Sequence, residues 1–302
     1  MSASFLDAIN QGKNRWIHYL LAFLCIIASA WFGIFASIFF SSLIIKTSFF
    51  IEKETTTCYS TNSWVGICFL PQLANYIVNT IPFFFLLMGV YVATKWIHQR
   101  SFLTLINPAG SIQWRRLTLG FGVWFFILSI QLLVELLWLP QHFEWSFHPL
   151  QLLAFLPIAL ILTPLQTSTE ELLFRGYFLQ AAGQLIKQPV ILAIATSLPF
   201  ITAHFSNSEM NRGGLWTGLT YGMLSLFLAT VTLKDNRLEL AIGIHAANNL
   251  FILLIANSAD SSLRSPALLT QIAFADPQVS FLATLIGAIA TYIFLFRNHR
   301  ND

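Results

Sequence analysis

Charged residues are scarce in this sequence, and their scarcity excludes an ordinary soluble domain. Only 10% of the 302 residues are Asp, Glu, Lys or Arg, whereas a soluble globular domain carries roughly 25%. Hydrophobic residues make up 56% of the chain. Long polar linkers are also missing, because apolar runs recur from residue 17 to residue 296. We therefore expect a single membrane domain over residues 1–302.

Cysteines and basic clusters are also sparse. The chain has 3 Cys, too few for a disulfide framework, although Cys58 and Cys68 share one polar loop and could pair if that loop faces an oxidising compartment. Cys25 lies inside an apolar run. The 16 Lys and Arg residues are scattered near the ends of apolar runs and form no basic patch with interleaved aromatic residues. Nucleic acid is therefore not an expected partner. Membrane lipid is, because the chain is expected to be a membrane domain.

The apolar runs predict about eight transmembrane helices, since a helix needs about 20 mostly apolar residues to cross the hydrocarbon core. A β-barrel would require alternating polar and apolar positions, which the runs do not show. The expected fold is therefore an all-α, polytopic transmembrane bundle in which helices are the only regular structure. The expected spans are 17–45, 72–94, 117–139, 150–168, 189–206, 214–233, 238–257 and 279–296.

The positions of the basic residues predict the orientation of the chain, because cytoplasmic loops are enriched in Lys and Arg. With the N-terminus inside, twelve of the 16 Lys and Arg residues fall on the cytoplasmic side. Both termini are then cytoplasmic, and residues 46–71 form an extracytoplasmic loop that contains Cys58 and Cys68. We expect an integral, multi-pass protein of a bacterial plasma membrane.

The segment 169–186 carries charged residues directly after the fourth apolar run. Glu171 and Arg175 are four residues apart, so on a helix they share a face and can form an ion pair. Glu170 points about 100° away and gains no such partner. An unpaired carboxylate in a low-dielectric environment is a candidate general base. The alternative is that all three charges form a solvated helix start at the cytoplasmic interface.

Two histidines in later apolar runs are further candidates. His204 ends the fifth run after Pro199, and a lone His at the end of a span is more often an interfacial residue than a catalytic one. His245 and Asn249 are four residues apart in the seventh run, with two alanines between them. This pair could donate two hydrogen bonds to one oxyanion. Small residues and buried polar groups also occur where membrane helices simply pack together.

Three motifs follow one another on successive expected helices. They are Glu-Glu-x-x-x-Arg at 170–175, Phe-x-x-x-His at 200–204 and His-x-x-x-Asn at 245–249. This ordered set resembles the CAAX protease and bacteriocin-processing (CPBP, or Abi) family, and the match covers about residues 150–257 as a catalytic core. The sequence contains no H-E-x-x-H zinc helix and no G-x-S-x-G nucleophile elbow.

The resemblance implies an intramembrane protease that hydrolyses a peptide bond with a glutamate-activated water. Glu170 would be the general base, and His204 would hold or activate the water. His245 and Asn249 would stabilise the oxyanion. The partner would be a peptide or protein substrate that is prenylated or otherwise associated with the membrane. The supporting ion pair would be Glu171 and Arg175.

Three alternatives stay open beside this interpretation. Glu170, His204 and His245 could form a three-ligand zinc site, but we favour a site without cofactor or metal because Asn249 is a poor zinc ligand and a good amide donor. The same fold could serve as a non-enzymatic scaffold or a bacteriocin-immunity-type protein. A transporter that relays protons through these side chains is the third alternative.

The expected topology creates one geometric difficulty. Glu170 and His245 would lie towards the cytoplasmic half of the membrane, whereas His204 would lie near the outer end of its span. The three can converge if the fifth helix begins deeper than expected or if the fourth is long. We expect a continuous fourth helix of about 30 residues, from 157 to 186.

Overall fold

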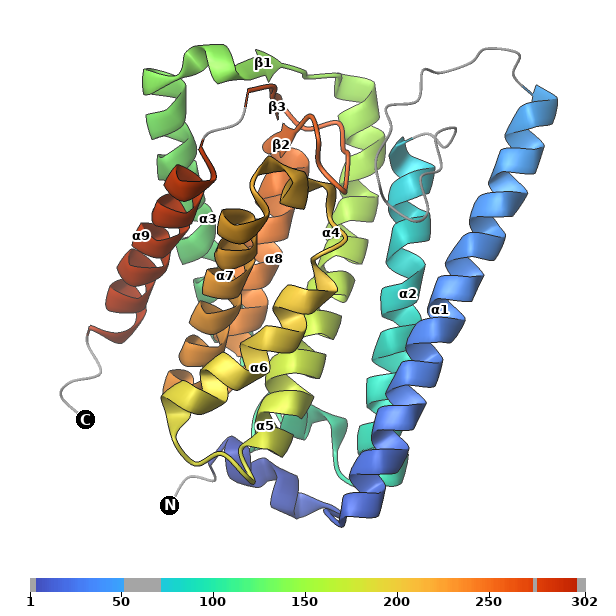
Figure 1. Ribbon diagram of the computed structural model, residues 1–302, viewed down its shortest axis with the longest axis vertical. Helices are drawn as coiled ribbons and strands as arrows, with labels where there is room; N and C mark the ends of the chain where they lie inside the picture. Colours follow the sequence, from blue (N-terminus) through green and yellow to red (C-terminus); the bar gives the residue numbers. More distant parts are fainter. Residues whose placement is uncertain (1–3, 52–71, 274–275, 298–302) are drawn as a thin grey trace.

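Long apolar helices dominate the computed structural model, which describes residues 4–51, 72–273 and 276–297 (Figure 1). Helices form here because a chain in hydrocarbon must pair every backbone N–H and C=O group within itself. Six helices are long and apolar enough to cross a membrane. They are α1 (Trp16–Ile51), α2 (Gln72–Val92, extended by η2), α3 (Trp114–Trp138), α4 (Pro149–Glu171, extended by η5 and α5), α7 (Gly214–Asp235) and α9 (Pro277–Phe296).

Two further apolar helices are shorter than a membrane span usually is. They are α6 (Pro189–Ala203), with 15 residues, and α8 (Glu239–Leu254), with 16 residues. The eight expected runs thus all contain helix, but only six have the length of a span. The count of eight spans and the cytoplasmic termini stay predictions.

Short helical turns connect and extend the long helices. Pro149, Pro189 and Pro277 stand at the starts of α4, α6 and α9, where proline's missing N–H group costs nothing. The 3₁₀ turns are η1 (Leu6–Gln11), η3 (Phe102–Leu105), η4 (Pro140–His142) and η6 (Ser208–Arg212), the π-helical segments are η2 (Ala93–Ile97) and η5 (Leu172–Phe178), and α5 is Leu179–Ala182.

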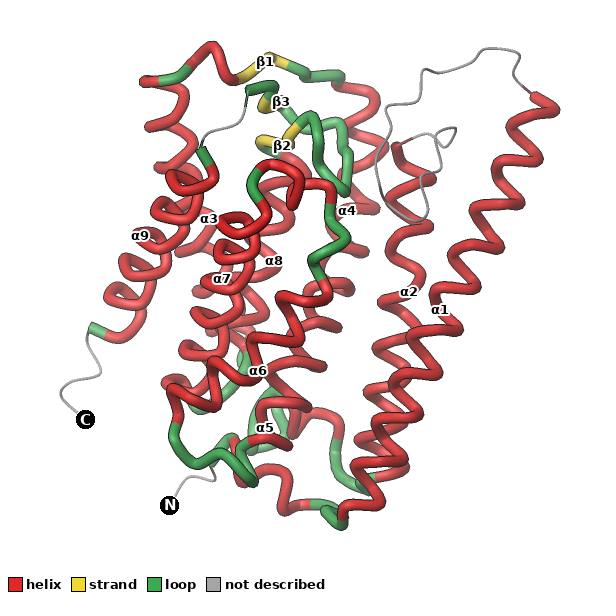
Figure 2. The backbone as a smooth tube through the Cα atoms, viewed as in Figure 1, coloured by secondary structure: helices red, strands yellow, loops and turns green. Residues whose placement is uncertain are grey.

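Three short strands form a small sheet at one end of the bundle (Figure 2). They are β1 (Phe143–Trp145), β2 (Ala256–Ser258) and β3 (Leu269–Gln271). The central strand β3 pairs antiparallel with β1 and parallel with β2. The expectation of helices alone is wrong here, because connecting segments that leave the bundle pair their backbone groups with one another. Segments of 3 residues are too short to show a strand periodicity.

The first expected loop begins later than the sequence suggested. α1 continues to Ile51, six residues beyond the expected end of the first span at residue 45. The remainder of the expected loop 46–71, with the proposed Cys58–Cys68 disulfide, lies outside the described residues. Cys25 is a free thiol within α1.

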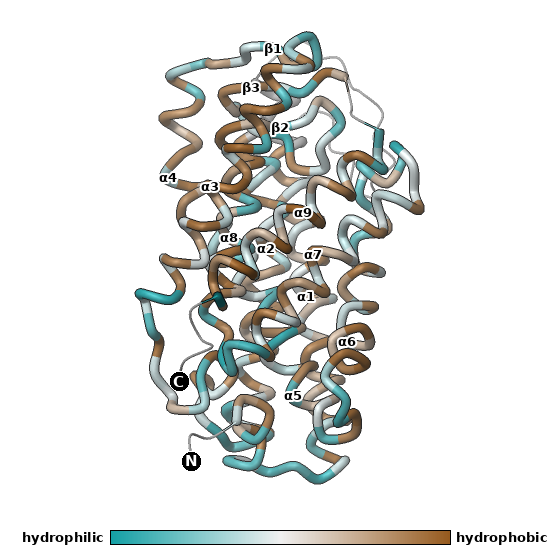
Figure 3. The backbone as a smooth tube through the Cα atoms, turned by 90° about the vertical axis from the view of Figure 1, so that its left-hand side faces the viewer, coloured by the Kyte–Doolittle hydropathy of each residue, from teal (hydrophilic) through white to brown (hydrophobic). Residues whose placement is uncertain are grey.

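The distribution of hydropathy along the bundle agrees with a membrane location. Hydrophobic residues fill the middle of the bundle, and hydrophilic segments gather towards its two ends (Figure 3). Many large apolar side chains on the outer helices are exposed, such as Phe35 on α1, Phe126 on α3 and Phe294 on α9. An exposed apolar belt of this kind is stable only against lipid.

The helix α8 lies inside the bundle and packs closely against α3. Two glycines allow the approach: a Cβ atom added at Gly243 would lie 2.0 Å from the Leu117 carbonyl oxygen, and one added at Gly120 would lie 2.4 Å from the Leu240 carbonyl oxygen. Small residues let membrane helices approach each other closely in this way. This contact positions the α8 face that carries His245.

Substituting Gly243 with Ala is expected to lower the free energy of unfolding by about 1–3 kcal/mol, because the added methyl group overpacks a backbone contact. Thermal unfolding of the purified protein in detergent micelles measures the change. Gly122→Ala on α3 is the matched control, since a Cβ atom there meets no other atom within 4 Å. Equal midpoints of thermal unfolding for the two variants would show that the α3–α8 contact has room for the added methyl group.

Candidate active site

The candidate site is built on one long helix that changes its winding at the first motif. Residues 149–182 form a continuous helical segment of 34 residues, so the long fourth helix expected from the motif order is confirmed, although its limits differ from 157–186. The α-helical part ends at Glu171, and the π-helical segment η5 follows from Leu172 to Phe178. π-helical turns are rare and frequently lie at functional sites.

Glu171 is the centre of a buried ionic cluster. Its Oε1 atom accepts a hydrogen bond from Arg175 Nη1 at 2.6 Å and lies 2.7 Å from His245 Nδ1. The side chains of Glu171 and Arg175 are 0% and 1% exposed. The expected ion pair is present, and it also holds His245, which the sequence did not indicate. Because a carboxylate only accepts hydrogen bonds, His245 donates its Nδ1 hydrogen to Glu171.

Arg175 also connects two other helices to the site. Its Nη2 atom donates to the carbonyl oxygen of Ser225 at 3.1 Å and to the Ser225 hydroxyl at 2.8 Å. Its guanidinium lies over the Phe200 ring, 4.6 Å from the ring centroid, a distance at which a cation is attracted to the face of an aromatic ring. Arg175 thereby connects η5 with α6, through Phe200, and with α7, through Ser225.

Glu170 is also buried, but no cation lies within hydrogen-bond distance of it in the part of the chain that the structure describes. Its Oε1 atom lies 3.4 Å from the Gln166 amide nitrogen, one helical turn earlier. Its Oε2 atom has no hydrogen-bond partner and lies 3.8 Å from His245 Nε2. The two adjacent glutamates therefore differ in kind: Glu171 is held by two basic groups, whereas one oxygen of Glu170 is left facing an imidazole.

His204 lies at the C-terminal end of α6, with its ring between two aromatic rings. Its ring centroid is 4.3 Å from that of Phe200 and 4.6 Å from that of Tyr221. Its Nδ1 atom donates to the Phe200 carbonyl oxygen at 2.7 Å, so Nε2 is the nitrogen left for chemistry. The Phe200 ring also lies 6.0 Å from the His245 ring. This shared neighbour brings the two histidines into one region of the bundle.

Asn249 is placed beside His245 by its helix rather than by a direct contact. The two residues are four apart on α8 and so share a face. Trp124 on α3 donates to Asn248 Oδ1 at 3.2 Å, and Asn248 donates in turn to Asn249 Oδ1 at 3.1 Å. This chain of hydrogen bonds engages the oxygen of the Asn249 amide and leaves its NH₂ group to donate elsewhere.

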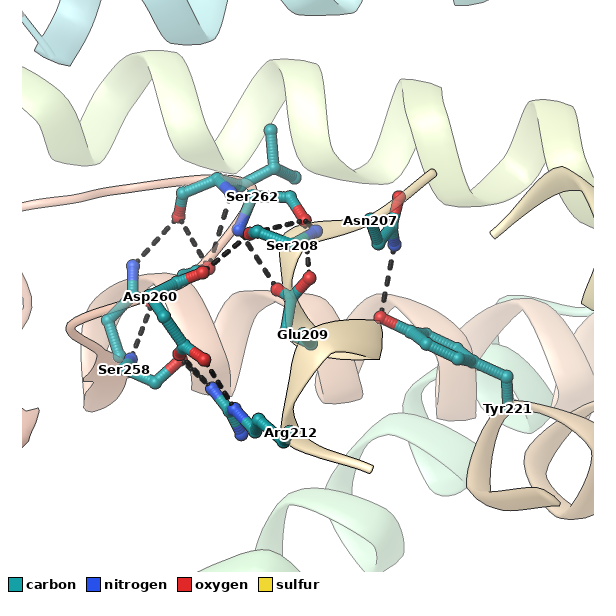
Figure 4. A network of polar contacts seen from close by, with 11 residues as sticks. Asn207, Ser208, Glu209, Arg212, Tyr221, Ser258, Asp260 and Ser262 are labelled. Atoms are coloured by element: carbon teal, nitrogen blue, oxygen red, sulfur yellow. Dashed lines mark hydrogen bonds and ion pairs between the residues drawn. The ribbon is translucent and has the colours of Figure 1, made fainter. Parts of the chain in front are cut away.

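A polar network fixes the loop that follows His204 (Figure 4). Asn207 donates to the Tyr221 hydroxyl at 3.0 Å, and Arg212 Nε donates to Asp260 Oδ2 at 2.7 Å. Burial alone would raise the pKa of Asp260, but the hydrogen bonds and charge of Arg212 outweigh it and the pKa is lowered. The network ties the α6–α7 connection to the loop after β2 and so holds Tyr221 against His204. Its remaining labelled members are Ser208, Glu209, Ser258 and Ser262.

The zinc alternative finds no support in the arrangement of side chains. Within the described part of the chain, no three His, Cys, Asp or Glu side chains gather closely enough to hold a metal ion. This includes the set Glu170, His204 and His245 named for zinc.

Several residues of the site had not been expected from the sequence. Gln166 is a polar residue in an apolar run and stands one helical turn before Glu170, so this spacing could have identified it. Ser225 and Tyr221 lie on α7, far from the motifs along the chain, and show no spacing signal. Phe200 is part of the second motif, but its ring contacts appear only in three dimensions.

The fold and the site together define a class of protein. It is a helical membrane protein with a buried polar cluster of two glutamates, an arginine and a histidine, His245, while the half-buried His204 lies nearby against Phe200. Residues 149–251 match the family described as "Type II CAAX prenyl endopeptidase Rce1-like", and the chain belongs to this family. The resemblance found in the sequence is thus confirmed.

One curated relative covers most of the chain. The "Uncharacterized protein YyaK" of Bacillus subtilis (strain 168) is 31% identical over 261 residues, which are 85% of this chain and 83% of YyaK. No solved structure matches this chain significantly.

Proposed function

We propose that this protein is an intramembrane endopeptidase in which Glu170 activates a water molecule to hydrolyse a peptide bond. The observation that carries the proposal is the difference between the two buried glutamates. Oε2 of each glutamate is buried without a hydrogen-bond partner among the described residues. Glu171, however, is neutralised by Arg175 through its Oε1 atom, whereas Glu170 has no such arginine partner and its Oε2 atom faces His245 Nε2 at 3.8 Å. A carboxylate that a fold keeps unpaired inside a membrane protein is suited to accept a proton.

In the proposed reaction, a water held near Glu170 and His204 attacks the scissile carbonyl carbon. A C–O bond forms while one proton of the water passes to Glu170 Oε2. The tetrahedral intermediate then collapses as the C–N bond breaks, and the proton moves from Glu170 to the leaving amine. Nε2 of His204 serves to orient the water, since its Nδ1 atom is committed to the Phe200 carbonyl oxygen.

The oxyanion of the intermediate would be stabilised by His245 and Asn249. His245 donates Nδ1–H to Glu171, so it can donate a second hydrogen from Nε2 only as an imidazolium. Asn249 offers the NH₂ group that its contact with Asn248 leaves available.

The substrate in this proposal is a peptide or protein associated with the membrane. The site lies between apolar helices, and the family name refers to prenyl endopeptidases, so prenylated tails are one substrate type to test. Residues 150–257 would form the catalytic core within a single membrane domain. An integral, multi-pass location in a bacterial plasma membrane belongs to the same proposal.

The test compares membrane-associated peptides in cells that carry either the intact protein or Glu170→Gln. Longer precursors should accumulate in the variant cells, and their missing products should give the cleavage site. A scaffold or immunity-type protein would leave the peptide pattern and the phenotype unchanged in the variant, provided that both proteins are present in equal amounts. Solute uptake into proteoliposomes without cleavage of any peptide would instead support a transporter.

A chelator should leave the activity of the purified protein unchanged, because the proposed base is a glutamate and the described side chains form no three-ligand cluster. Cleavage of an identified peptide is measured before and after prolonged dialysis against EDTA, followed by addition of Zn²⁺. Loss of cleavage that Zn²⁺ restores would replace this mechanism with the zinc alternative.

A further inference from the structure

A cavity that neither glutamate lines opens at the end of the bundle where η1 lies. It has a volume of about 510 Å³ and lies among the start of α6, the second half of α7, α9 and the segment before η1. Leu192 and Leu226 contribute to its apolar wall. A volume of this size is typical of sites for small molecules.

The cavity runs from an exposed rim to a buried floor. Val190 at the rim is 60% exposed, whereas Phe5 and Leu192 are each 1% exposed and Ala193 is 3% exposed. The apolar wall therefore continues from the lipid-facing surface of α6 into the bundle. A hydrocarbon chain could enter from the bilayer without crossing a polar layer.

Basic side chains stand at the helix ends that border this cavity. Lys187, just before α6, and Lys234, in the last turn of α7, both line it. Lys234 also lines an adjoining cavity of about 250 Å³ together with Arg116, Arg237 and Asp235. The two cavities thus share a wall that carries a positive charge.

The charges around Lys234 are not balanced. The carboxylate of Asp235 is bound by Arg116, whose Nε atom donates to it at 2.9 Å, so it does not neutralise the other cations. The Nε atom of Arg237 is buried and has no hydrogen-bond partner among the described residues. Within the described ranges, Lys187 donates only to a neutral carbonyl, that of Gly183, at 3.0 Å. The helix ends therefore present unpaired positive charge beside an apolar cavity.

We propose that this double cavity is a binding site for one anionic phospholipid. One acyl chain occupies the apolar cavity, and the phosphate lies at Lys234 with Lys187 and Arg237 on either side of it. Helix ends are where the headgroup region of a bilayer meets a membrane protein, and basic pockets between helices bind anionic headgroups at that depth. An apolar cavity with basic side chains at its entrance matches a phospholipid rather than a free anion or an apolar molecule.

The bound lipid stabilises the helices that carry the candidate site. Leu226 lines the cavity, while its neighbour Ser225 accepts the hydrogen bonds of Arg175. A lipid that fills the space between α6 and α7 therefore supports the same two helices that hold Phe200 and Ser225. Binding to the folded state alone raises the midpoint of thermal unfolding.

The experiment titrates the full-length protein in detergent micelles with phosphatidylglycerol or with phosphatidylcholine of the same acyl chains. Thermal unfolding should shift upwards by about 3 °C or more with phosphatidylglycerol and much less with phosphatidylcholine. Native mass spectrometry should show one retained lipid. Inorganic phosphate alone and a prenylated peptide are tested in parallel.

Two variants separate the headgroup from the acyl chain. The double variant Lys187→Gln/Lys234→Gln should weaken binding of phosphatidylglycerol about twenty-five-fold, at about a factor of five for each lysine. Thr230→Trp should block the apolar cavity while it keeps both lysines, because Thr230 lines that cavity. Lys95→Gln is the control, since Lys95 is an exposed lysine in η2, outside both cavities.

Four results would overturn the proposal. Equal shifts of the unfolding midpoint with the two lipids would show that the basic residues do not distinguish the two headgroups. An equal shift with inorganic phosphate would show that the site binds simple anions. Displacement of the lipid by the prenylated peptide, with cleavage abolished in Thr230→Trp, would assign the cavity to substrate. Unchanged binding in both variants would place the lipid elsewhere on the protein.

Discussion

Glu170→Gln should leave a folded protein in which the rate of peptide cleavage falls by about 10⁴-fold, the upper range for the loss of a general base. The substitution keeps the size of the side chain and its contact with Gln166, and it removes only the ability to take up a proton. Thermal unfolding should be unchanged or shifted slightly upwards, since the buried charge that leaves the interior has one oxygen, Oε2, without a hydrogen-bond partner among the described residues. Single-turnover cleavage of a peptide that accumulates in the variant cells is the measurement.

The matched control is Glu135→Gln. Glu135 is a half-buried carboxylate on the membrane helix α3, outside the ionic cluster. Its substitution should leave cleavage within about twofold of the original rate, because surface changes away from such clusters have small effects. If both variants cleave at the original rate, Glu170 is not the base and the proposed reaction fails. If both are inactive and unfold early, the loss reflects stability rather than chemistry.

Composition and spacing predicted the parts of this structure that depend on local sequence. The apolar runs located eight helices because apolar length and helix formation are directly connected in a membrane. The spacing of Glu171 and Arg175 predicted their ion pair because residues four apart on a helix are neighbours. The motif order also favoured a long fourth helix, and residues 149–182 form one.

Other features depend on contacts between distant segments, and the sequence alone did not show them. Ser225 became part of the site only through the packing of α7 against η5. The strands β1 and β3 lie more than 120 residues apart and pair because two connections meet at one end of the bundle. The π-helical winding after Glu171 has no marker in the sequence that we can name.

Arg175→Met should be the most destabilising single substitution in the site, with a loss of about 3–5 kcal/mol in the free energy of unfolding. That is the usual cost when one partner of a buried ion pair is removed and the other charge remains. Glu171 would keep only His245 as a basic partner, beside the charge of Glu170. Ser225 would lose both of its hydrogen bonds from Arg175. Unfolding in mixed micelles with increasing SDS measures the loss.

Arg100→Met provides the comparison for burial without an anionic partner. Arg100 is 4% exposed, and its burial lowers its pKa to about 10, yet its Nη1 atom donates to the neutral amide of Gln180 at 2.7 Å. Its removal leaves no buried carboxylate unpaired. The loss for Arg100→Met should therefore be clearly smaller than for Arg175→Met, and equal losses would mean that the charge of Glu171 is irrelevant.

The double variant Arg175→Met/Glu171→Gln then separates stability from catalysis. Removing both charges should restore most of the lost free energy of unfolding, because no uncompensated carboxylate of the pair remains. Cleavage should stay absent, since His245 loses the carboxylate that holds its Nδ1 hydrogen and orients its Nε2 atom towards Glu170. Recovery of both stability and cleavage would show that the ion pair is not needed for the reaction. Recovery of stability alone would show that Glu171 and Arg175 serve the reaction through the imidazole.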